Sequence, residues 1–450
     1  MTVPESASEL PNGFKMTELG PLPEEWGAVR LGEIFEIQQG KALSRKKDKG
    51  VRPRPFLRTA NVLWGRIDLT TLDFMDFASD EEKKYDLRPD DLLVCEGGEI
   101  GRTAIWSGEL PGIYYQNHIH RLRCVSEDTC PQFYMYWMQA AFTLLGLYTG
   151  AGNKTTIPNL SGSRLAAFLV PSPPLPEQRA IAHVLRTVQK AKEATERVIA
   201  AARELKKSLM QHLFTYGPVP VDRTDRVAMQ ETEIGPLPRH WEVVRLGDVA
   251  ARTFSGGTPS TKVPEYWNGG IPWTTSAIIS EDAVLLTQYQ KSISSRGLER
   301  SSSKLVPAGS LIVGTRVGVG KAVVATFDIA ISQDLTALLL NDGVIPLFLA
   351  YALKSDLVRE KISGITRGTT IKGVPRKDLM NVPTPLPPLP EQREIARILQ
   401  AVDRKIEAEE RREAALEAVF KALLHDLMTA RRRLPAEFIQ RFEHQEADAR

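Results

Sequence analysis

The chain contains one long internal repeat. The segment 17–32 recurs as 232–247 with 11 of 16 positions identical, and the hexapeptide Pro-Leu-Pro-Glu-Gln-Arg occupies both 174–179 and 388–393. Two copies separated by more than 200 residues do not form a solenoid, and each copy is long enough to be a domain. The stretches between these shared motifs have diverged. The repeat therefore predicts one scaffold, used twice, that presents two different surfaces.

Length and composition limit the class of protein. At 450 residues the chain is too long for one core, so two or three domains are expected. With 42% hydrophobic and 25% charged residues it resembles an ordinary globular protein, without an apolar run of membrane-spanning length or a signal peptide. Cys95, Cys124 and Cys130 have no CxxC spacing, which predicts neither a disulfide framework nor a zinc site. We expect a cytoplasmic protein.

The basic charge is local. The net charge of +3 argues against indiscriminate nucleic-acid binding, which needs a basic face. Lys and Arg outnumber Asp and Glu by 17 to 12 over residues 235–382, whereas the count over 20–170 is 18 to 19. Within the first copy, seven basic residues between Lys41 and Arg54 are accompanied by only one acid, Asp48.

Each copy has the pattern of a mixed α+β domain. Leu92–Cys95 and Leu311–Val313 are short apolar runs, typical of buried strands, and a glycine-rich turn follows each of them. Residues 131–145 and 346–361 are expected to form helices that begin at a proline. A polar segment with a shared Thr-Thr-Ile then precedes the hexapeptide in both copies.

Each hexapeptide is predicted to open a long helix. The residues that follow it contain no glycine or proline as far as about Phe214 in one copy and Arg433 in the other, and they are rich in strong helix formers. Proline and glutamate suit the first turn of a helix. A helix of about 38 residues would be about 57 Å long.

The two long helices share an apolar seam in one register. The seam residues are Ile181, Leu185, Val188, Ala202, Leu209 and Leu213, and then Ile395, Leu399, Val402, Leu416, Leu423 and Leu427. We expect the helices to pair as a coiled coil because neither could be enclosed by one small domain. The alternative is that each helix packs separately on its own domain.

The sequence shows no recognisable active site. Residues 314–322 resemble a phosphate-binding loop, but the spacing is wrong by one residue and Ala322 replaces the magnesium-binding hydroxyl. A glycine-rich turn between strands is the better interpretation. The seven histidines have no metal-binding spacing, and His118 and His120 are expected to be structural.

The paired PLPxxWxxVxLG openings, the Thr-Thr-Ile segments and the repeated PLPEQRxIAxxL helix starts closely resemble the specificity subunit of type I restriction–modification enzymes. The resemblance covers the chain from about Thr17 to Arg433. It implies an α+β fold in which two target recognition domains are joined and spaced by two long antiparallel helices, forming a coiled coil with pseudo-two-fold symmetry. The implied domains are 16–172 and 231–386, with conserved helices at 173–216 and 387–433 and a linker at 217–230.

The resemblance also implies partners and cofactors. The subunit would be non-catalytic, would read a bipartite, asymmetric site in double-stranded DNA, and would scaffold two methyltransferase subunits and the restriction (translocase) subunits. The complex would have adenine methyltransferase and ATP-dependent endonuclease activity. S-adenosylmethionine, ATP and magnesium would be used by the partner chains and none would be bound by this one.

Candidate DNA contacts are basic and polar residues in glycine-flanked loops, which suit phosphate and base-edge contacts. In the first copy they are Lys41, Arg45, Lys46, Lys47, Lys49, Arg52, Arg54, Asn153, Lys154, Thr155 and Thr156. In the second copy they are Ser255, Gly256, Gly257, Thr258, Ser260, Lys262, Arg316, Lys321, Arg367, Thr369, Thr370 and Lys372. For each of them a solvated surface position is the alternative, and for the whole chain the alternative is an adaptor that binds a non-DNA partner.

Overall fold

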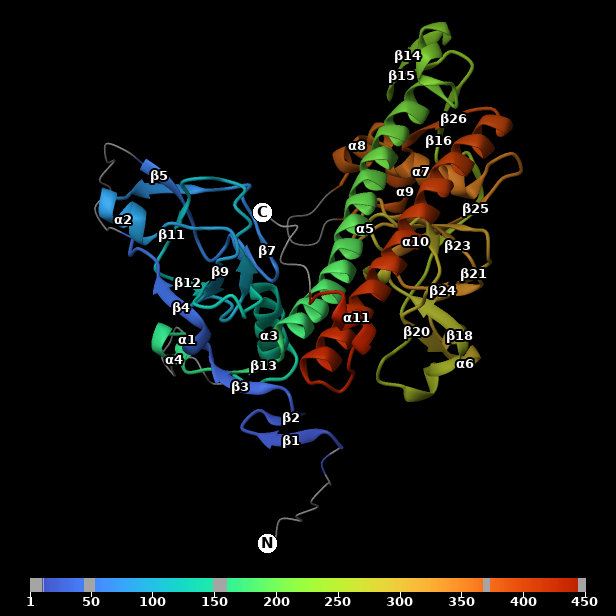
Figure 1. Cartoon of the computed structure of the whole chain (residues 1–450). Coiled ribbons are helices and arrows are strands. Elements are labelled where there is room, and N and C mark those ends of the chain that lie inside the picture. The colour runs from blue at the N-terminus through green and yellow to red at the C-terminus, as the bar shows by residue number, and fades with distance from the viewer. Residues whose placement is uncertain (1–9, 11, 44–52, 149–159, 367–372, 444–450) are drawn as a thin grey trace. The chain divides into compact units, whose positions relative to one another are not determined.

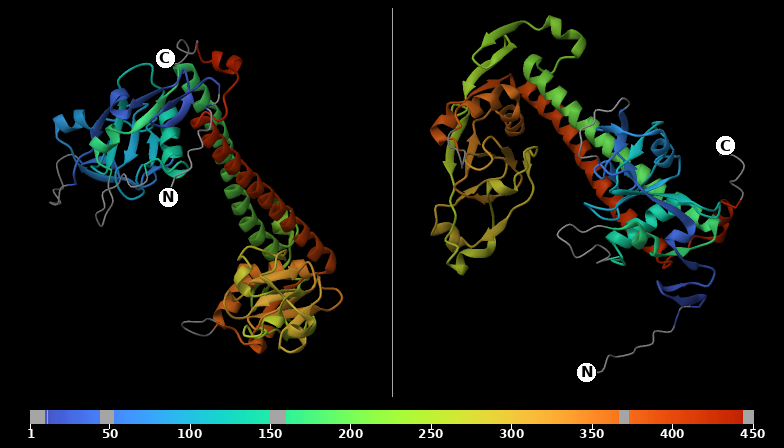
Figure 2. Two further views of the ribbon diagram at one scale, coloured as in Figure 1. Left: turned by 90° about the horizontal axis from the view of Figure 1, so that it is seen from below. Right: turned by 90° about the vertical axis from the view of Figure 1, so that its left-hand side faces the viewer.

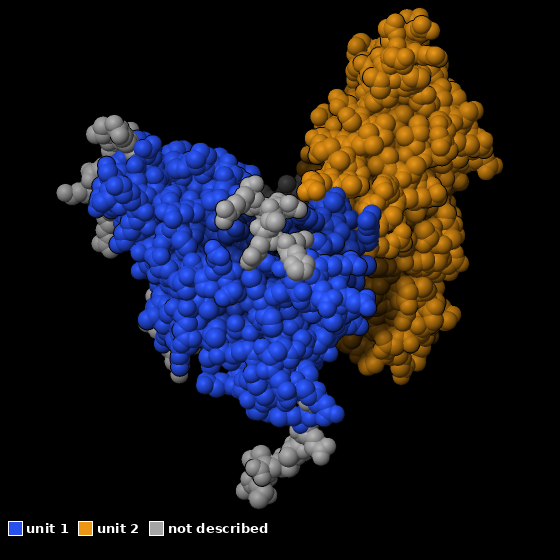
Figure 3. All heavy atoms as spheres, viewed as in Figure 1, with its two compact units in different colours: residues 1–195, 412–450 blue, residues 196–411 orange. Residues whose placement is uncertain are grey.

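The computed structural model describes residues 10, 12–43, 53–148, 160–366 and 373–443. The chain divides into two compact units (Figure 3), one formed by residues 1–195 with 412–450 and the other by 196–411. The division falls inside both long helices, α5 (Leu175–Tyr216) and α10 (Leu389–Met428). Each unit therefore contains one of the two expected target recognition domains, called its recognition region below, and a part of each long helix.

The recognition region of unit 1 contains a central four-stranded antiparallel sheet. Its strand order is β10 (Thr103–Ile105), β9 (Leu92–Cys95), β12 (Ile119–Cys124) and β4 (Phe35–Gln39). The helix α3 (Pro131–Thr143) buries eight of its 13 residues in the same core. A second sheet has the order β11 (Tyr114–Tyr115), β5 (Pro53–Leu57) and β8 (Asp73–Asp76). The small hairpin β6 (Val62–Leu63) and β7 (Arg66–Ile67) is separate and lies against β10 and β9 of the first sheet.

Short elements connect this region to the long helix. The hairpin β1 (Phe14–Thr17) and β2 (Gly20–Pro23) is followed by β3 (Gly27–Arg30), which pairs with β13 (Leu169–Ser172) immediately before α5. The remaining short helices are α1 (Leu31–Ile34), α2 (Ser79–Lys84), α4 (Gly162–Ala166) and α11 (Ala436–Gln440). The repeated opening motif and the hexapeptide thus meet through one two-stranded ladder.

Unit 2 repeats this frame. Its larger sheet has the order β17 (Ala250–Ser255), β25 (Leu335–Leu340), β22 (Leu311–Gly314), β23 (Ala322–Ala325) and β19 (Leu285–Leu286). The first four strands correspond to β4, β12, β9 and β10 of unit 1, and β19 is added in parallel to β23. The hairpin β14 (Met229–Thr232) and β15 (Gly235–Pro238) and the pair β16 (Glu242–Arg245) and β26 (Pro383–Leu386) match their counterparts.

The second sheet of unit 2 differs from that of unit 1. It has four strands in the order β20 (Lys291–Ile293), β18 (Trp267–Thr274), β24 (Ile329–Ile331) and β21 (Lys304–Val306). Strands β24, β18 and β20 repeat the order and the directions of β11, β5 and β8 in unit 1. The added strand β21 pairs with β24, so the second sheet is one strand wider in unit 2. The short helices are α6 (Ser295–Glu299), α9 (Arg376–Met380) and the 3-10 turns η1 (Val221–Arg226), η2 (Pro264–Tyr266) and η3 (Ser276–Ile278).

Most expected elements are present. The strands at 92–95 and 311–313 are fully buried, and the sequence 314–322 forms the turn of the antiparallel hairpin β22–β23, which confirms that it is not the strand-to-helix loop of a nucleotide site. The helix expected over 346–361 is instead broken into α7 (Pro346–Lys354) and α8 (Asp356–Gly364). Ser355 has an extended backbone between them and its hydroxyl donates to the carbonyl of Ala352.

The helices α5 and α10 run side by side and antiparallel (Figures 1 and 2), as the apolar seam predicts. In unit 1, Lys192 of α5 pairs with Glu417 of α10 at 2.7 Å. In unit 2, Lys206 of α5 pairs with Asp403 of α10 at 2.6 Å. The later residue of α5 therefore pairs with the earlier residue of α10, as expected for antiparallel helices.

Each helix also packs on a recognition region at both of its ends. Ile181 and Leu185 of α5 lie in the core of unit 1, together with Leu424 and Leu427 of α10. The core of unit 2 contains Leu213 and Phe214 of α5, together with Ile395 and Leu399 of α10. The two helices therefore pair with each other and also pack on both recognition regions, so the alternative in which each helix packs separately on its own domain is wrong.

Candidate nucleic-acid interface

The opening motif and the hexapeptide are joined by a tryptophan–glutamate hydrogen bond in each unit, buried in unit 1 and partly buried in unit 2. In unit 1, the indole Nε1 of Trp26 donates to Oε2 of Glu177 at 2.9 Å. In unit 2, Nε1 of Trp241 donates to Oε2 of Glu391, also at 2.9 Å. Both indoles are almost fully buried, so the carboxylate is the polar partner that makes this burial possible. Each glutamate lies in the first turn of its long helix, where the helix dipole favours negative charge.

The neighbouring glutamine of the hexapeptide forms a second connection. The amide Nε2 of Gln178 donates to the carbonyl of Pro173, and its Oε1 accepts from the backbone N–H of Cys130 at 2.9 Å. Gln392 repeats both bonds, to the carbonyl of Pro387 and from the backbone N–H of Ile345. Cys130 and Ile345 immediately precede α3 and α7, so the glutamine ties the start of the long helix to the start of a core helix.

The basic side chains that accompany the two glutamates differ. Arg433 follows α10 and donates through Nε and Nη2 to Glu177, at 2.8 and 3.0 Å, and through Nη2 to Glu25. In unit 2, Glu391 instead meets His240, at 2.7 Å between Nε2 and Oε1. We call the sets Trp26–Glu177–Arg433 and Trp241–Glu391–His240 the first and second anchor.

The candidate DNA contacts of the first recognition region lie mostly outside the described residues. This holds for Arg45, Lys46, Lys47, Lys49, Arg52, Asn153, Lys154, Thr155 and Thr156. Lys41 and Arg54 are described and both face the acidic helix α2. The Lys41 ammonium meets Glu81 and the carbonyl of Asp76, and Nε of Arg54 donates to Glu82 at 2.7 Å. Their charge is thus partly balanced within the protein.

Close packing of the backbone requires glycine at both candidate glycine positions of the second region. A Cβ atom on Gly256 would lie 1.9 Å from the carbonyl oxygen of Ile331, and one on Gly257 would collide with Ser302. Gly40 follows β4 as Gly256 follows β17, and a Cβ atom there would lie 2.3 Å from the carbonyl oxygen of Gln116. Both glycines permit close backbone packing at the same place in the frame.

The remaining polar candidates of this region divide into bonded and exposed residues. The hydroxyl of Ser255 shares a hydrogen bond with Thr336, Thr258 donates to Gln333, and the Ser260 carbonyl accepts from Trp267. Lys262 and Arg316 are exposed. Lys321 is half-buried and its ammonium donates to the carbonyl of Ile279 at 2.7 Å. Arg367, Thr369, Thr370 and Lys372 lie outside the described residues.

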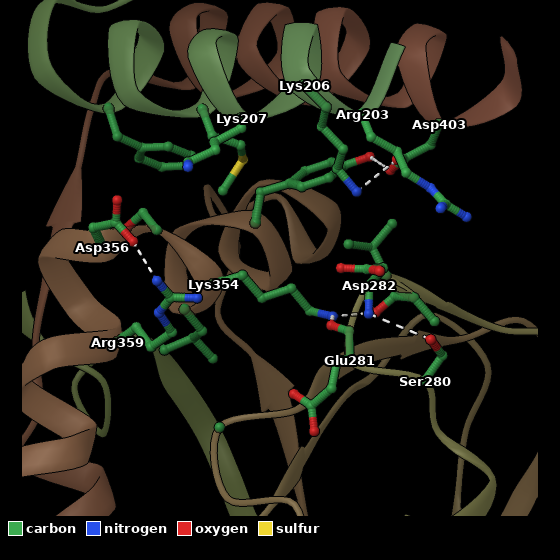
Figure 4. A pocket seen from close by; sticks show the side chains of 18 of the residues that line it. Arg203, Lys206, Lys207, Ser280, Glu281, Asp282, Lys354, Asp356, Arg359 and Asp403 are labelled. Atoms are coloured by element: carbon green, nitrogen blue, oxygen red, sulfur yellow. Dashed lines mark hydrogen bonds and ion pairs between the residues drawn. The ribbon is translucent and has the colours of Figure 1, made fainter. Parts of the chain in front are cut away.

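Sequence reasoning missed a large groove in unit 2 (Figure 4). It has a volume of about 1370 Å³ and is lined by α5, α7, α8, α10 and the loops 280–287 and 318–320. Charged residues of both signs, including Arg203, Lys207 and Glu407, lie beside apolar ones such as Met210 and Phe214. Only the alternation of charged and apolar residues on the long helices could have indicated it.

A buried polar cluster forms one wall of this groove. The Tyr351 hydroxyl donates to Asp403 at 2.5 Å, and Asp403 also pairs with Lys206. Burial and the adjacent Asp403 carboxylate raise the pKa of Tyr351 above its usual range. Lys354, one helical turn further along, donates to the carbonyls of Glu281 and Ala283, and burial lowers its pKa to about 8.

Other chemistry is not indicated by the described part of the chain. Among those residues no group of three or more His, Cys, Asp or Glu is placed to hold a metal ion. Cys95 is buried, and burial raises the pKa of its thiol to about 11, so it is a poor nucleophile. Within the same residues, none of the helices is long and apolar enough to span a membrane.

Comparisons with known proteins agree with these features. Solved structures with a similar fold are the S subunit of the type I restriction–modification system of M. genitalium and a chain from a study of complex assembly in a type I system. The first has a TM-score of 0.59 at 15% identity, covering 89% of this chain and 96% of that one. The second has a TM-score of 0.52 at 22% identity, covering 90% and 98%.

Relatives by sequence come from an archaeon and a bacterium. A candidate type I restriction enzyme specificity subunit (MjaX) of Methanocaldococcus jannaschii is 25% identical over 94% of this chain and 97% of its own length. The MjaVIII specificity subunit of the same organism is 24% identical over 92% and 94%. The EcoBI specificity subunit of Escherichia coli is 22% identical over 83% and 78%.

The model of the type I restriction modification DNA specificity domain matches the chain twice, at residues 23–202 and 238–418. Each match begins at an opening motif and continues into a long helix. The two matches together cover most of the chain, which therefore belongs to the family of type I restriction–modification DNA specificity proteins.

Proposed function

We propose that this DNA specificity subunit reads a bipartite, asymmetric site, one half with each recognition region, and has no catalytic role of its own. The observation that carries the proposal is the duplicated frame whose second sheet differs between the units in strand number and in sequence. A three-stranded sheet covers the core in unit 1 and a four-stranded sheet in unit 2. Sequence is read by side chains that reach base edges, so two different surfaces would read two different half-sites.

The residues proposed to contact DNA are those named from the sequence. Lys262 and Arg316 support the proposal best among the described candidates because they are exposed. Lys41, Arg54 and Lys321 need local rearrangement, since each is engaged by a carboxylate or carbonyl group of the protein. Phosphate contacts would supply most of the affinity and base contacts the discrimination.

The partner chains would supply the chemistry. We propose that two methyltransferase subunits bind S-adenosylmethionine and methylate adenine, and that restriction subunits use ATP and magnesium. The groove of unit 2 supports the docking of one partner because the half-buried, apolar Met210 lies beside exposed charges there. Action on chromosomal DNA places the complex in the cytoplasm. An adaptor for a non-DNA partner is disfavoured by the family to which the chain belongs.

An exchange of recognition regions tests the proposal. Residues 32–170 are replaced by the matching segment of a relative, and the chain is expressed with its methyltransferase partner. Genome-wide mapping of methylated bases should show one half of the site changed and the other half and the methylated base type retained. A change in both halves, or methylation by the purified chain alone, would contradict the two-reader model.

A further inference from the structure

The two anchors connect each recognition region to its long helix through one carboxylate. Glu177 is almost fully buried and accepts three hydrogen bonds, one from Trp26 and two from Arg433. The indole belongs to the segment that leads into the recognition region, and the carboxylate belongs to the helix. A change in the angle between these segments must therefore break at least one of these bonds.

Proline alone does not fix this angle. Pro174 and Pro388 limit the backbone at one position each, but the chain can still turn at the neighbouring residues. The carboxylate, buried in unit 1 and partly buried in unit 2, adds a constraint that acts across 151 residues of sequence in unit 1 and 150 in unit 2. Charge-assisted hydrogen bonds are short and directional, which makes them suited to hold an orientation.

The first anchor also involves the end of the other helix. Arg433 lies after α10 and reaches both Glu177 and Glu25, so three separate segments of the chain meet at one carboxylate. The Arg433 guanidinium also lies 5.9 Å from the centre of the Trp26 ring. The second anchor has His240, from the same segment as Trp241, in the place of this arginine.

We propose that Glu177 and Glu391 are positioning residues for DNA reading, each of which sets the orientation of one recognition region on the helix pair. This inference rests on the proposed two-reader function. Phosphate contacts tolerate small reorientations better than base contacts do. Loss of an anchor should therefore lower discrimination at one half-site and leave the affinity for random DNA unchanged.

The test uses the full chain, assembled with its methyltransferase partner, carrying Glu177→Gln or Glu391→Gln. The probes are duplexes with the mapped methylation site, with single base changes in either half, and with random sequence. We expect Glu177→Gln to reduce discrimination about tenfold at the half-site read by the first region, the equivalent of about 1.4 kcal/mol. Glu391→Gln should act on the other half-site alone.

Matched variants separate positioning from general damage. Glu394→Gln removes an exposed carboxylate that pairs with Arg397 near the start of α10, outside the anchor, and should have no effect on either half-site. Arg433→Met should reproduce Glu177→Gln at the first half-site only. Melting temperatures of all variants identify any that fail to fold.

Two outcomes would overturn the positioning role. One is equal loss of discrimination at both half-sites in each variant, and the other is discrimination identical to that of the unmodified complex. A wild-type complex that does not distinguish the mapped site from random duplex would instead refute the proposed function itself. The two failures are therefore distinguishable.

Discussion

Equivalent positions in the two units hold the same tyrosine in different surroundings. In unit 1, the hydroxyl of Tyr136 donates to Oε1 of Gln189 at 2.8 Å, and the ring packs edge-on against Phe420. In unit 2, the hydroxyl of Tyr351 donates to Asp403, and the ring lies under the ammonium of Lys206. Each set joins a core helix to both long helices, at offsets of 214 or 215 residues.

This difference shows which part of the design is duplicated. The tyrosine and its bond to the long helix are kept in both units, so the geometry of the core helix on the helix pair is the shared element. The side chain that packs on the tyrosine ring is Phe420 in unit 1 and Lys206, which forms an ion pair, in unit 2. Unit 2 therefore has an ion pair beside its groove, whereas the tyrosine of unit 1 contacts an amide and an aromatic ring.

The largest expected effect comes from removing the carboxylate that Tyr351 and Lys206 share in unit 2. Asp403→Ala leaves the ammonium of Lys206 and the hydroxyl of Tyr351 without their acceptor. The two charged side chains are 17% and 16% exposed. We expect a loss of about 2–3 kcal/mol in the free energy of unfolding, somewhat less than for a fully buried pair. Gln189→Ala in unit 1 should cost only about 1 kcal/mol, the value of a neutral hydrogen bond. Chemical denaturation of both variants measures the difference.

A double substitution checks the cause. Lys206→Phe combined with Asp403→Gln gives unit 2 the partners that Tyr136 has in unit 1. If the loss in Asp403→Ala comes from an unpaired charge, the double variant should be more stable than that variant. Equal losses would mean that the packing around Tyr351 differs between the units in ways that the three side chains do not explain.

The sequence predicted the duplicated elements better than the divergent ones. The buried strands, the glycine-rich hairpin turn and the paired helices follow from apolar runs and from a seam that both copies share. The break at Ser355 was missed because the helical pattern continues on both sides of it. The extra strand β19 has only two residues, Leu285 and Leu286, and its pairing with β23 is set by tertiary contacts.

The candidate site was predicted only in part. The hexapeptide was recognised as a helix start, but the roles of Glu177 and Gln178 depend on partners about 50 to 150 residues away. No local pattern encodes such partners. Gly256 was interpreted as a position for close approach to a phosphate. The structure gives it a packing role against Ile331, and its DNA contact stays a prediction.

A smaller expected effect is the pH dependence of stability that Lys354, in the groove of unit 2, produces. Burial lowers the pKa of Lys354 from 10.5 to about 8. Between these values the unfolded chain binds the proton and the folded chain does not, so this lysine makes stability rise with pH. The stability of the wild type relative to Lys354→Met should therefore increase from pH 7.5 to 9.5. Denaturation at both pH values measures it, and Lys207→Met, at an exposed lysine of the same groove, should show no such increase.

The smallest effect concerns the two recognition surfaces. Lys262 of unit 2 is exposed, whereas Lys41 of unit 1 is engaged by Glu81 and lies 5.0 Å from the centre of the Phe77 ring. A lysine that contacts a phosphate contributes about one released counterion to binding. We expect Lys262→Ala to weaken binding of the assembled complex to all duplexes alike and to reduce the salt dependence by about one unit in slope. Lys41→Ala should change the slope less, because its charge is already balanced by a carboxylate.

Binding measured over a series of salt concentrations tests both variants. If Lys41→Ala changes the slope as much as Lys262→Ala does, then DNA displaces Glu81 from Lys41, and the two regions use their lysines in the same way.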